Sequence, residues 1–567
     1  MFQVIYQQLD QQAPAQPLTV WALAAFLLFG TALARGETEI RNDQAALGVS
    51  GAALLISPPP IEGVVGDISI SNRNVFDLTD PAEGGALYRF ANRIHVRTRA
   101  DVIEQQLLLK PGDDYSAQAI EESERILRAN RYIHDASITP VLHGDGVVDL
   151  EVATTDVWTL MPKLSYTQSG GASDVSVGIK ETNLFGTGVM LELDIKSDPD
   201  RDSKILRYKD QNLGDSWYGL SALYSDNSDG HDYALDFGKP FYSLDSKSSN
   251  RIYFQDFDRV DSFYDRGELA SEYRHEGSTQ NFAYGWSRGL NGDWVRRFSV
   301  GYVSDEHLFS NAEDSLYPPG VLPANRILNY PVIGFEIVED QFEKTSNVNQ
   351  IHRVEDRYFG TRFGARLGYA SEGLGSDRDA WIIDMNAHTG FGSSAKNSLM
   401  LDGGLEARLE QGDVQNLKMM MSAGYYRRYS ERSMFHVGLS GYLGHNLDLD
   451  NYVQLGGDSG IRGYPLRYQT GDSAVLLTVE HRLFTKWYPF RLFRVGGAIF
   501  FDAGRTWGSG EPSVSDNELL RDVGIGLRLG GDRSGLGRMI HIDLAFPLDG
   551  RDDIDSMQLY ISTKKSF

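Results

Sequence analysis

Residues 189–196 read VMLELDIK, and this short stretch decides the class of fold. Apolar and charged side chains alternate along it, with Val189, Leu191, Leu193 and Ile195 set against Glu192, Asp194 and Lys196. Successive side chains of a β-strand point to opposite faces of the sheet. The stretch therefore predicts a strand with one apolar face and one charged face.

The same alternation recurs through the second part of the chain, from Trp158 to Phe567. Residues 359–369 and 399–410 repeat it over about 9–12 residues each, longer than the usual ~5–6 residues of a strand in soluble proteins. No helical pattern interrupts this part to cover an apolar sheet face. Long strands with an apolar outer face and a polar lumen are typical of transmembrane barrels. We therefore predict a mainly β protein in which residues 157–567 form a transmembrane antiparallel β-barrel.

The composition restricts the function as well as the fold. The 567 residues include 54 Lys and Arg against 78 Asp and Glu, which gives a net charge of −24. Nucleic-acid binding needs clustered positive charge, so this balance argues against a nucleic-acid partner. The chain has no cysteine, which excludes disulfides, thiolate metal sites and cysteine nucleophiles.

A single nearly continuous apolar run, from Val20 to Leu33, precedes all of these strands. A run of about 14 residues suits the core of a secretory signal peptide better than a membrane-spanning helix. It is followed by the small-x-small pattern ALA at residues 32–34, which signal peptidase accepts. We predict a signal peptide over residues 1–34 and a linker over residues 35–66; the alternative to the signal peptide is a retained anchor or an interfacial helix.

Residues 67–156 are the only part with helical signals, and they predict one small α+β domain. Thr98 followed by Asp101 matches a capping box, which predicts a first helix. Ser116 is a good N-cap for a second helix that ends near Asn130. Alternating residues predict one strand before these helices and two after them, around Ile68 and Ile70, over 136–142 and over 147–152.

Four short motifs follow one another at strand-length spacing near the C-terminus: GGDSGIRGY at 456–464, FFDAG at 500–504, GIGLR at 524–528 and HIDLAFP at 541–547. Together they resemble the superfamily of outer-membrane barrels that contains BamA, TamA and the two-partner-secretion transporters. By the same resemblance, the α+β domain is similar to one POTRA domain, where members of the superfamily usually carry two or more. NLFGTG at 183–188 resembles the first hairpin of such a barrel.

The resemblance and the alternation differ on the number of strands. The resemblance implies about 16 strands, whereas about 20 alternating segments can be marked between Leu160 and Phe567. Both ends of the barrel segment should lie on the same side of the membrane, so the number must be even. We expect 16 to 20 strands.

The first of the four motifs predicts a loop that folds back into the barrel. Gly460 and Gly463 flank Ile461 and Arg462, and Tyr464 follows. Glycine on both sides lets the backbone bend sharply and approach a wall closely.

Alternation places Glu480, Asp502 and Arg528 on the luminal faces of their strands. A charge held in a confined lumen needs an opposite charge beside it. We therefore expect Arg462 to pair with Asp502, with Glu480 as a further partner. Such a pair either only stiffens a plugged lumen or holds a gate that can open, and the sequence is compatible with both.

The last residues predict the strand that closes the barrel. Met557, Leu559 and Ile561 alternate outward, and the chain ends on Phe567. A final amphipathic strand with a terminal aromatic residue is the pattern that barrel-insertion machinery recognises.

The sequence carries no complete catalytic or metal-binding motif. GDSG at 457–460 matches a serine-protease tetrapeptide, but no matching His motif is present and Ile461 stands where that family has Gly. The 12 His residues are scattered, without the paired spacing of a metal site. We expect no enzyme, no cofactor and no metal.

These features favour a factor that assembles or translocates polypeptides in the outer membrane of a Gram-negative-type bacterium. A POTRA-like sheet in the periplasm can bind an unfolded or extended client polypeptide along a sheet edge. The barrel would then insert the client among the outer-membrane lipids or pass it across them. The alternative is a pore, or a structural or lipid-handling barrel whose POTRA-like domain docks a periplasmic partner.

The mature protein should begin at Arg35, because the apolar run and its small-x-small end lie before that residue. N-terminal sequencing of the protein from outer-membrane fractions measures this directly. A first residue ahead of Arg35 would contradict the predicted site.

Deletion of Phe567 should impair insertion of the barrel without disturbing the α+β domain, because the closing strand loses its terminal aromatic ring. The measurement is the level of the truncated protein in the outer membrane, together with its heat-modifiable gel mobility. Normal values of both would show that Phe567 is dispensable.

Overall fold

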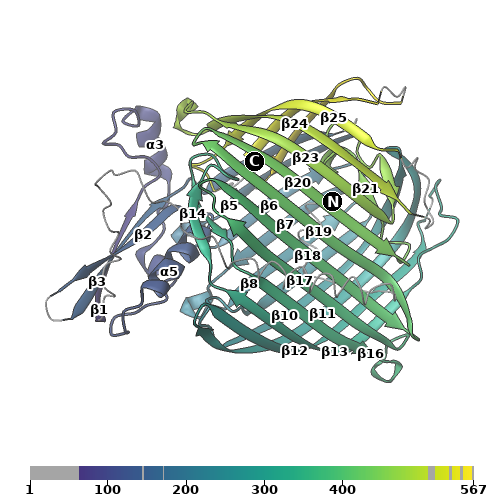
Figure 1. The fold of residues 1–567 in the computed structure, drawn as a ribbon, viewed down its shortest axis with the longest axis horizontal. Coiled ribbons are helices and arrows are strands. Elements are labelled where there is room, and N and C mark those ends of the chain that lie inside the picture. Colours follow the sequence, from purple (N-terminus) through teal and green to yellow (C-terminus); the bar gives the residue numbers. More distant parts are fainter. Residues whose placement is uncertain are drawn as a thin grey trace, which may run out of the picture.

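The computed structural model describes residues 63–564, apart from short segments at 144–145, 170–171, 314, 509–517, 536–538 and 550–552. The expected signal peptide, most of the expected linker and Phe567 lie outside the described residues. Figure 1 shows two parts, a small α+β domain and a large barrel. Within the described residues, no helix is both long enough and apolar enough to cross a membrane.

The α+β domain is built on a three-stranded sheet. Its elements are β1 Val64–Arg73, α3 Ala86–Ile94, α4 Ala100–Glu104, α5 Ala117–Ala129, β2 Ile133–Leu142 and β3 Val147–Asp156. The strand order is β1-β3-β2, with β3 parallel to β1 and antiparallel to β2. β1 therefore starts three residues before the expected boundary at residue 67, and β2 is an edge strand.

One compact apolar core holds this domain together. Ile103 of α4 and Leu127 of α5 are fully buried against Ile133, Val148 and Leu150 of the sheet. Burying each such side chain contributes about 1.5–3 kcal/mol, which offsets the ordering of a short chain. The apolar side chains of β1–β3 and those of α5 thus pack together on one face of the sheet.

The second helix begins and ends where the sequence predicted. The Ser116 hydroxyl accepts a hydrogen bond from the Ala119 amide at 3.2 Å, and α5 ends at Asn130. The predicted capping box of the first helix is wrong. α4 has only five residues and its N-cap is Arg99, because Thr98 instead donates its amide and its hydroxyl to the Asp156 carboxylate at 2.7 and 2.9 Å.

The structure also contains α3, a helix that precedes the two predicted ones and was not predicted from the sequence. α3 buries no residue and has no side-chain cap at its N-terminus. Leu87 and Phe90 are among its exposed residues. Leu87, Phe90 and Ile94 recur at helical spacing on one face of α3, so the sequence did contain the periodic signal of an amphipathic helix.

Within the described residues the barrel contains 20 strands, the upper limit of the expected range. They are β4 Leu160–Ser169, β5 Ala172–Glu181, β6 Met190–Ser197, β7 Asp202–Asp210, β8 Gly219–Asn227, β9 Gly230–Lys239, β10 Ser248–Asp265, β11 Glu268–Asn291, β12 Trp294–Asn311, β13 Arg326–Glu339, β16 Arg362–Ala370, β17 Ala380–Gly392, β18 Asn397–Glu410, β19 Asp413–Ser430, β20 Ser433–His445, β23 Ser473–Phe484, β24 Arg494–Trp507, β25 Leu520–Gly530, β26 Met539–Pro547 and β27 Gln558–Lys564. Each strand neighbours the next barrel strand along the chain, and β27 lies beside β4.

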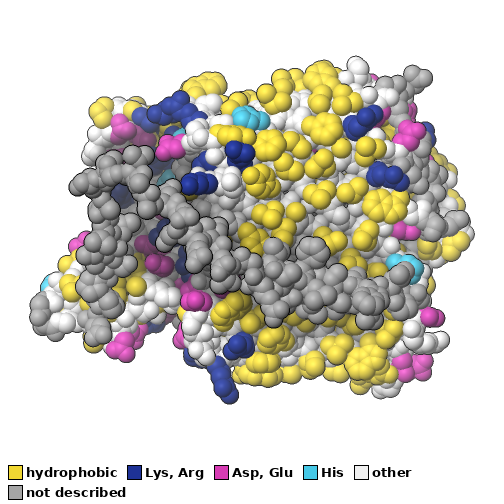
Figure 2. Space-filling model, in the orientation of Figure 1, with side chains coloured by type: hydrophobic (Ala, Val, Ile, Leu, Met, Phe, Trp, Pro, Cys, Tyr) yellow, Lys and Arg dark blue, Asp and Glu magenta, His cyan; other side chains and the backbone are white. Residues whose placement is uncertain are grey.

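The two faces of the barrel wall differ as the alternation predicted. On β6, Leu193 and Ile195 are 48% and 65% exposed on the outside, whereas Glu192 and Asp194 are buried toward the lumen. Figure 2 shows apolar side chains spread over the outer surface of the barrel, with charged groups mostly toward its two ends. An apolar belt between polar ends matches the hydrocarbon layer of a membrane.

The α+β domain packs against one end of the barrel, which we call the near end (Figure 1). The near-end turn at 183–188 bonds to it: Asn183 donates its side-chain amide to the Thr98 hydroxyl at 2.8 Å, and the Arg99 amide donates to the Gly186 carbonyl at 3.0 Å. This turn joins β5 to β6, so it is not the first hairpin of the barrel. The opposite end is called the far end.

Replacing Ser116 by Ala should loosen the first turn of α5, because the helix loses its capping oxygen. The expected cost is about 1 kcal/mol, or roughly fivefold faster amide exchange at Ala119 in the full-length protein. Ser116→Asp keeps a capping oxygen and serves as the control. Equal exchange in the Ala variant and the wild type would show that the cap does not hold this turn.

Candidate functional site

The segment between β20 and β23 folds into the barrel and is called the luminal loop, residues 446–472. It contains two short strands, β21 Val453–Leu455 and β22 Gln469–Gly471, which pair with each other. Five apolar side chains of the loop are almost completely buried: Val453, Leu455, Ile461, Tyr464 and Tyr468. They form one cluster with side chains of the inner wall, namely Met420, Tyr442, Ala474, Leu476 and Leu520. The loop is therefore a packed part of the lumen.

Two glycines let the loop approach the wall. Gly460 has φ +115°, and a Cβ atom there would lie 2.3 Å from the Leu476 side chain. A Cβ atom at Gly463 would lie 2.7 Å from Asp522 Cβ, and the Gly463 amide donates to the Asp522 carboxylate at 2.8 Å. Any larger residue would push the loop away from the wall.

The structure brings Arg462 together with the partners expected from the sequence. Arg462 donates Nε and Nη2 to the Asp502 carboxylate at 2.7 and 3.0 Å, a bidentate contact, and Nη1 to Glu480 at 3.1 Å. Its guanidinium also stacks over the Phe500 ring, with Cζ 3.4 Å from the ring centroid. Arg462 is 5% exposed and Asp502 is fully buried.

Further charges extend this contact into a network that we call the luminal cluster. It comprises Arg462, Glu480, Arg482, Asp502, Arg528 and Asp543. Arg482 donates to Glu480 at 2.9 Å, Arg528 pairs with Asp543, and Arg462 reaches Asp543 at 3.4 Å. Three cations thus face three carboxylates, so each buried charge has an opposite charge beside it, and the desolvation cost is offset by several short contacts.

The glycine-flanked motif and the alternation together predicted most but not all of this cluster and its surroundings. Gly460, Ile461, Arg462, Gly463, Tyr464, Glu480, Asp502 and Arg528 lie in it or directly beside it. Arg482 and Asp543 of the cluster, and Phe500 beside it, were missed. Arg482 lies two residues from Glu480, and Phe500 two residues from Asp502, so the same parity rule would have placed both on the luminal face.

Three ion pairs anchor the luminal loop at the far end. Arg467 of the loop binds Asp200 in the turn between β6 and β7, with contacts of 2.9 and 2.6 Å. Asp450 of the loop accepts two hydrogen bonds from Arg326, at 2.8 and 2.7 Å. A third pair joins Asp448 to Arg408 of β18. The loop therefore reaches several separate parts of the wall.

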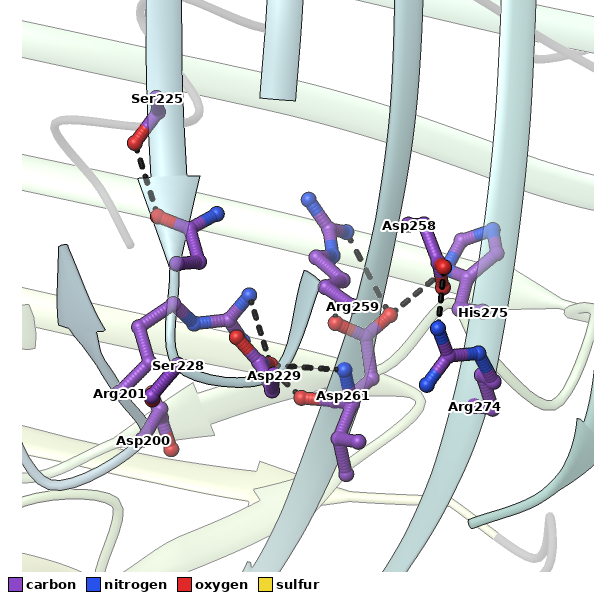
Figure 3. Close-up of polar contacts among 12 residues, drawn as sticks. Asp200, Arg201, Ser225, Ser228, Asp229, Asp258, Arg259, Asp261, Arg274 and His275 are labelled. Atoms are coloured by element: carbon purple, nitrogen blue, oxygen red, sulfur yellow. Dashed lines mark hydrogen bonds and ion pairs between the residues drawn. The ribbon is translucent and has the colours of Figure 1, made fainter. Parts of the chain in front are cut away.

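The wall around Asp200 is cross-linked by its own polar contacts (Figure 3). Asp229, in the turn after β8, accepts a hydrogen bond from the Val260 amide at 2.8 Å and pairs with Arg201 at 3.3 Å. On β10, Asp261 binds both Arg259, at 2.7 Å, and His275 of β11, at 2.6 Å. These contacts fix the turns to which the luminal loop is bound.

The residues of the predicted closing strand lie outside the luminal cluster. Leu559 and Ile561 lie on β27, opposite Leu544 and Ile542 of β26, and Met557 directly precedes the strand. Met557 and Leu559 are exposed on the outer surface and are not part of the luminal cluster. No group of His, Asp and Glu side chains suited to a metal ion occurs in the part of the chain that the structure describes.

The fold and the cluster define a class: a barrel preceded by an α+β domain, with an arginine-pinned loop in its lumen. The family model described as the Omp85 superfamily domain matches residues 183–567, more than half of the chain. The protein belongs to the Omp85 superfamily. A comparison with curated protein sequences gives no match.

Solved structures of similar fold include two kinds of protein. CdiB from Acinetobacter baumannii is 13% identical with a TM-score of 0.45, over 89% of this chain and 74% of that one. CdiB from Escherichia coli is 12% identical with a TM-score of 0.36, over 98% and 100%. BamA from Haemophilus ducreyi lacking POTRA domains 1–3 is 12% identical with a TM-score of 0.37, over 88% and 84%.

Arg462→Ala and Asp502→Ala should each free the luminal loop while leaving the barrel folded. Each change leaves a buried charge without one of its partners, at a cost of about 3–5 kcal/mol to the docked loop, whereas the ladders between strands are untouched. Because the two residues are partners, the double variant should be little worse than either single variant. Single-channel conductance and heat-modifiable mobility measure the two effects.

Arg505→Ala is the matched control for this pair, because Arg505 lies on the same strand as Asp502 and is exposed. It should leave the conductance unchanged. Strictly additive changes in the double variant, or wild-type conductance in Arg462→Ala, would refute the pairing as the contact that holds the loop.

Proposed function

We propose that this protein is an outer-membrane factor that assembles or translocates polypeptides. In this proposal the α+β domain lies in the periplasm as a POTRA-like module and binds an unfolded or extended client. The barrel, its apolar belt in contact with outer-membrane lipids, inserts the client into the membrane or passes it across. No covalent step is involved, so the protein is not an enzyme.

One observation supports this proposal above the others: part of the lumen is occupied by a loop that belongs to the chain and is held by contacts that can be exchanged, while a cavity remains along the luminal faces of β10–β13, β16 and β17. The luminal loop is tied to the wall by ion pairs and hydrogen bonds of its side chains, with no covalent link. A polypeptide that passes needs a lumen that can be vacated, and such contacts can be replaced by water or by a client. Membership of the Omp85 superfamily supports the same direction.

Depletion of the protein in its own bacterium should lower the outer-membrane level of at least one class of client protein and raise its unfolded form in the periplasm. Quantitative proteomics of the two compartments is the measurement. Complementation with the wild type should restore the levels. An unchanged outer-membrane proteome after depletion would contradict the proposal.

Photo-crosslinking identifies the client directly. A photoreactive residue that replaces Thr139, which is exposed on β2, should capture client polypeptides. A photoreactive residue that replaces Leu87, which is exposed on α3, should not capture them. The captured chains should be the same proteins that fall after depletion. Capture at both positions alike, or of unrelated proteins, would speak against client binding at the sheet edge.

A second candidate is a structural or lipid-handling barrel whose POTRA-like domain docks a partner. The specific support is the number of anchors at the far end, where three ion pairs hold the luminal loop. A permanently filled lumen suits a role on the outer surface of the barrel. In that case depletion should change lipid composition or asymmetry and leave protein levels constant.

A further inference from the structure

The longest near-end connection forms a hairpin of its own, which we call the near-end hairpin, residues 340–361. It contains β14 Phe342–Ser346 and β15 Val354–Tyr358, which pair with each other and not with the barrel strands. It leaves the wall after β13 and returns to it at β16. Figure 1 shows β14 beside β2 and α5, between the α+β domain and the barrel.

The tip of this hairpin reaches into the near end of the lumen. Val348 and Ile351 are fully or almost fully buried, and they pack on luminal side chains at the near ends of other strands, namely Met434, Phe484, Ala498 and Met539. These four side chains belong to β20, β23, β24 and β26, several strands away from β13 and β16. The hairpin therefore crosses the mouth of the barrel.

Hydrogen bonds hold the tip in that place. Arg482 of the luminal cluster donates to the Val348 carbonyl at 3.1 Å. Arg428 donates to the Ser346 carbonyl at 2.7 Å, and the His352 ring lies 3.1 Å from the Thr485 carbonyl. Arg482 also binds Glu480, which in turn binds Arg462. Arg482 therefore links the tip of the hairpin to the contact that holds the luminal loop.

The base of the hairpin is bound by α5 through a group of charges that we call the latch: Glu124, Arg128, Lys344 and Asp356. Arg128 donates Nε and Nη2 to the Asp356 carboxylate, both at 2.7 Å. Glu124 pairs with Lys344. Burial raises the pKa of Glu124, but its bonds from Lys344 and the Ile138 amide outweigh this and leave the pKa below its usual range, so the carboxylate is charged.

The same two α5 side chains also occupy the open edge of β2. The Ile138 amide donates to Glu124 at 2.8 Å, and the Ala136 carbonyl accepts from Arg128 Nη1 at 2.8 Å. These backbone groups point away from β3 and are those that an added strand would use. Pro140, two residues on, has no amide to offer, so the bonded stretch is the main part of this edge.

We propose that the near-end hairpin is a plug, and that the edge of β2 is the site where an extended client segment releases it. A client strand that pairs with Ala136 and Ile138 must displace Arg128 and Glu124 from them. These side chains are also the ones that hold Asp356 and Lys344, so strand addition and plug retention compete for the same groups. This inference rests on the proposed function, because it assumes a polypeptide client.

Because the chain contains no cysteine, a single introduced thiol is the only group that a maleimide can label at a cysteine. Ile351→Cys places a single thiol at the buried tip, and the rate of its labelling by a maleimide in the full-length protein reports the position of the plug. Arg128→Ala and Asp356→Ala, each added to this background, should raise the labelling rate about tenfold or more, as expected for loss of a bidentate charged contact. Heat-modifiable mobility verifies that the barrel remains folded.

The control for these variants is Lys110→Ala. Lys110 pairs with Asp215 at 3.3 Å and so also joins the α+β domain to the barrel, but it does not touch the hairpin. Its labelling rate should equal that of the parent. Unchanged labelling in both latch variants, or the same increase in Lys110→Ala, would overturn the latch.

The client arm uses a synthetic peptide that copies residues 557–567 of this chain, a barrel strand with a terminal Phe. Added to the parent protein, it should raise the labelling rate of Cys at position 351, whereas the same peptide N-methylated at alternate residues should not, because it cannot complete a ladder. Equal effects of the two peptides, or none, would overturn release by strand addition. The depletion experiment is independent of this one. If depletion lowers the client levels but the labelling rate does not change, the latch is refuted and the proposed function still stands.

Discussion

The guanidinium of Arg462, bound by Asp502 and Glu480 over the ring of Phe500, is the contact on which the contents of the lumen depend. A buried guanidinium is costly unless carboxylates compensate it, and here they come from the wall while the arginine comes from the loop. The pairing therefore fixes the loop to β23 and β24 at one point. With that point fixed, the apolar side of the loop packs against the wall, and its far-end ion pairs come within reach of their partners.

Segments of the chain itself enter the lumen from both ends and occupy part of it. The luminal loop enters from the far end and the near-end hairpin from the other, and Arg482 binds both Glu480 and the Val348 carbonyl. The α+β domain is connected to this series of contacts through Arg128 and Asp356. A continuous series of contacts thus links the α+β domain to the contact that holds the luminal loop.

Local rules failed where tertiary contacts competed with them. Thr98 and Asp101 have the spacing of a capping box, but Thr98 donates both its amide and its hydroxyl to the buried Asp156 carboxylate. α3 is a different case, because Leu87, Phe90 and Ile94 recur along it at helical spacing and the sequence therefore contained its signal. By contrast, Ser116 and Asn130 marked the ends of α5 correctly, since capping there depends only on neighbouring residues.

The sequence by itself determined the barrel, the inward direction of Glu480, Asp502 and Arg528, and the presence of a glycine-flanked arginine loop. Those features follow from a period of two residues and from local backbone freedom, both of which a short window of sequence contains. Only the tertiary structure decided which charges meet, because Arg462 and Asp543 are 81 residues apart and Arg128 and Asp356 are 228 residues apart. Such pairs depend on the register of every intervening strand and on the distance across the lumen, and no local pattern specifies either one.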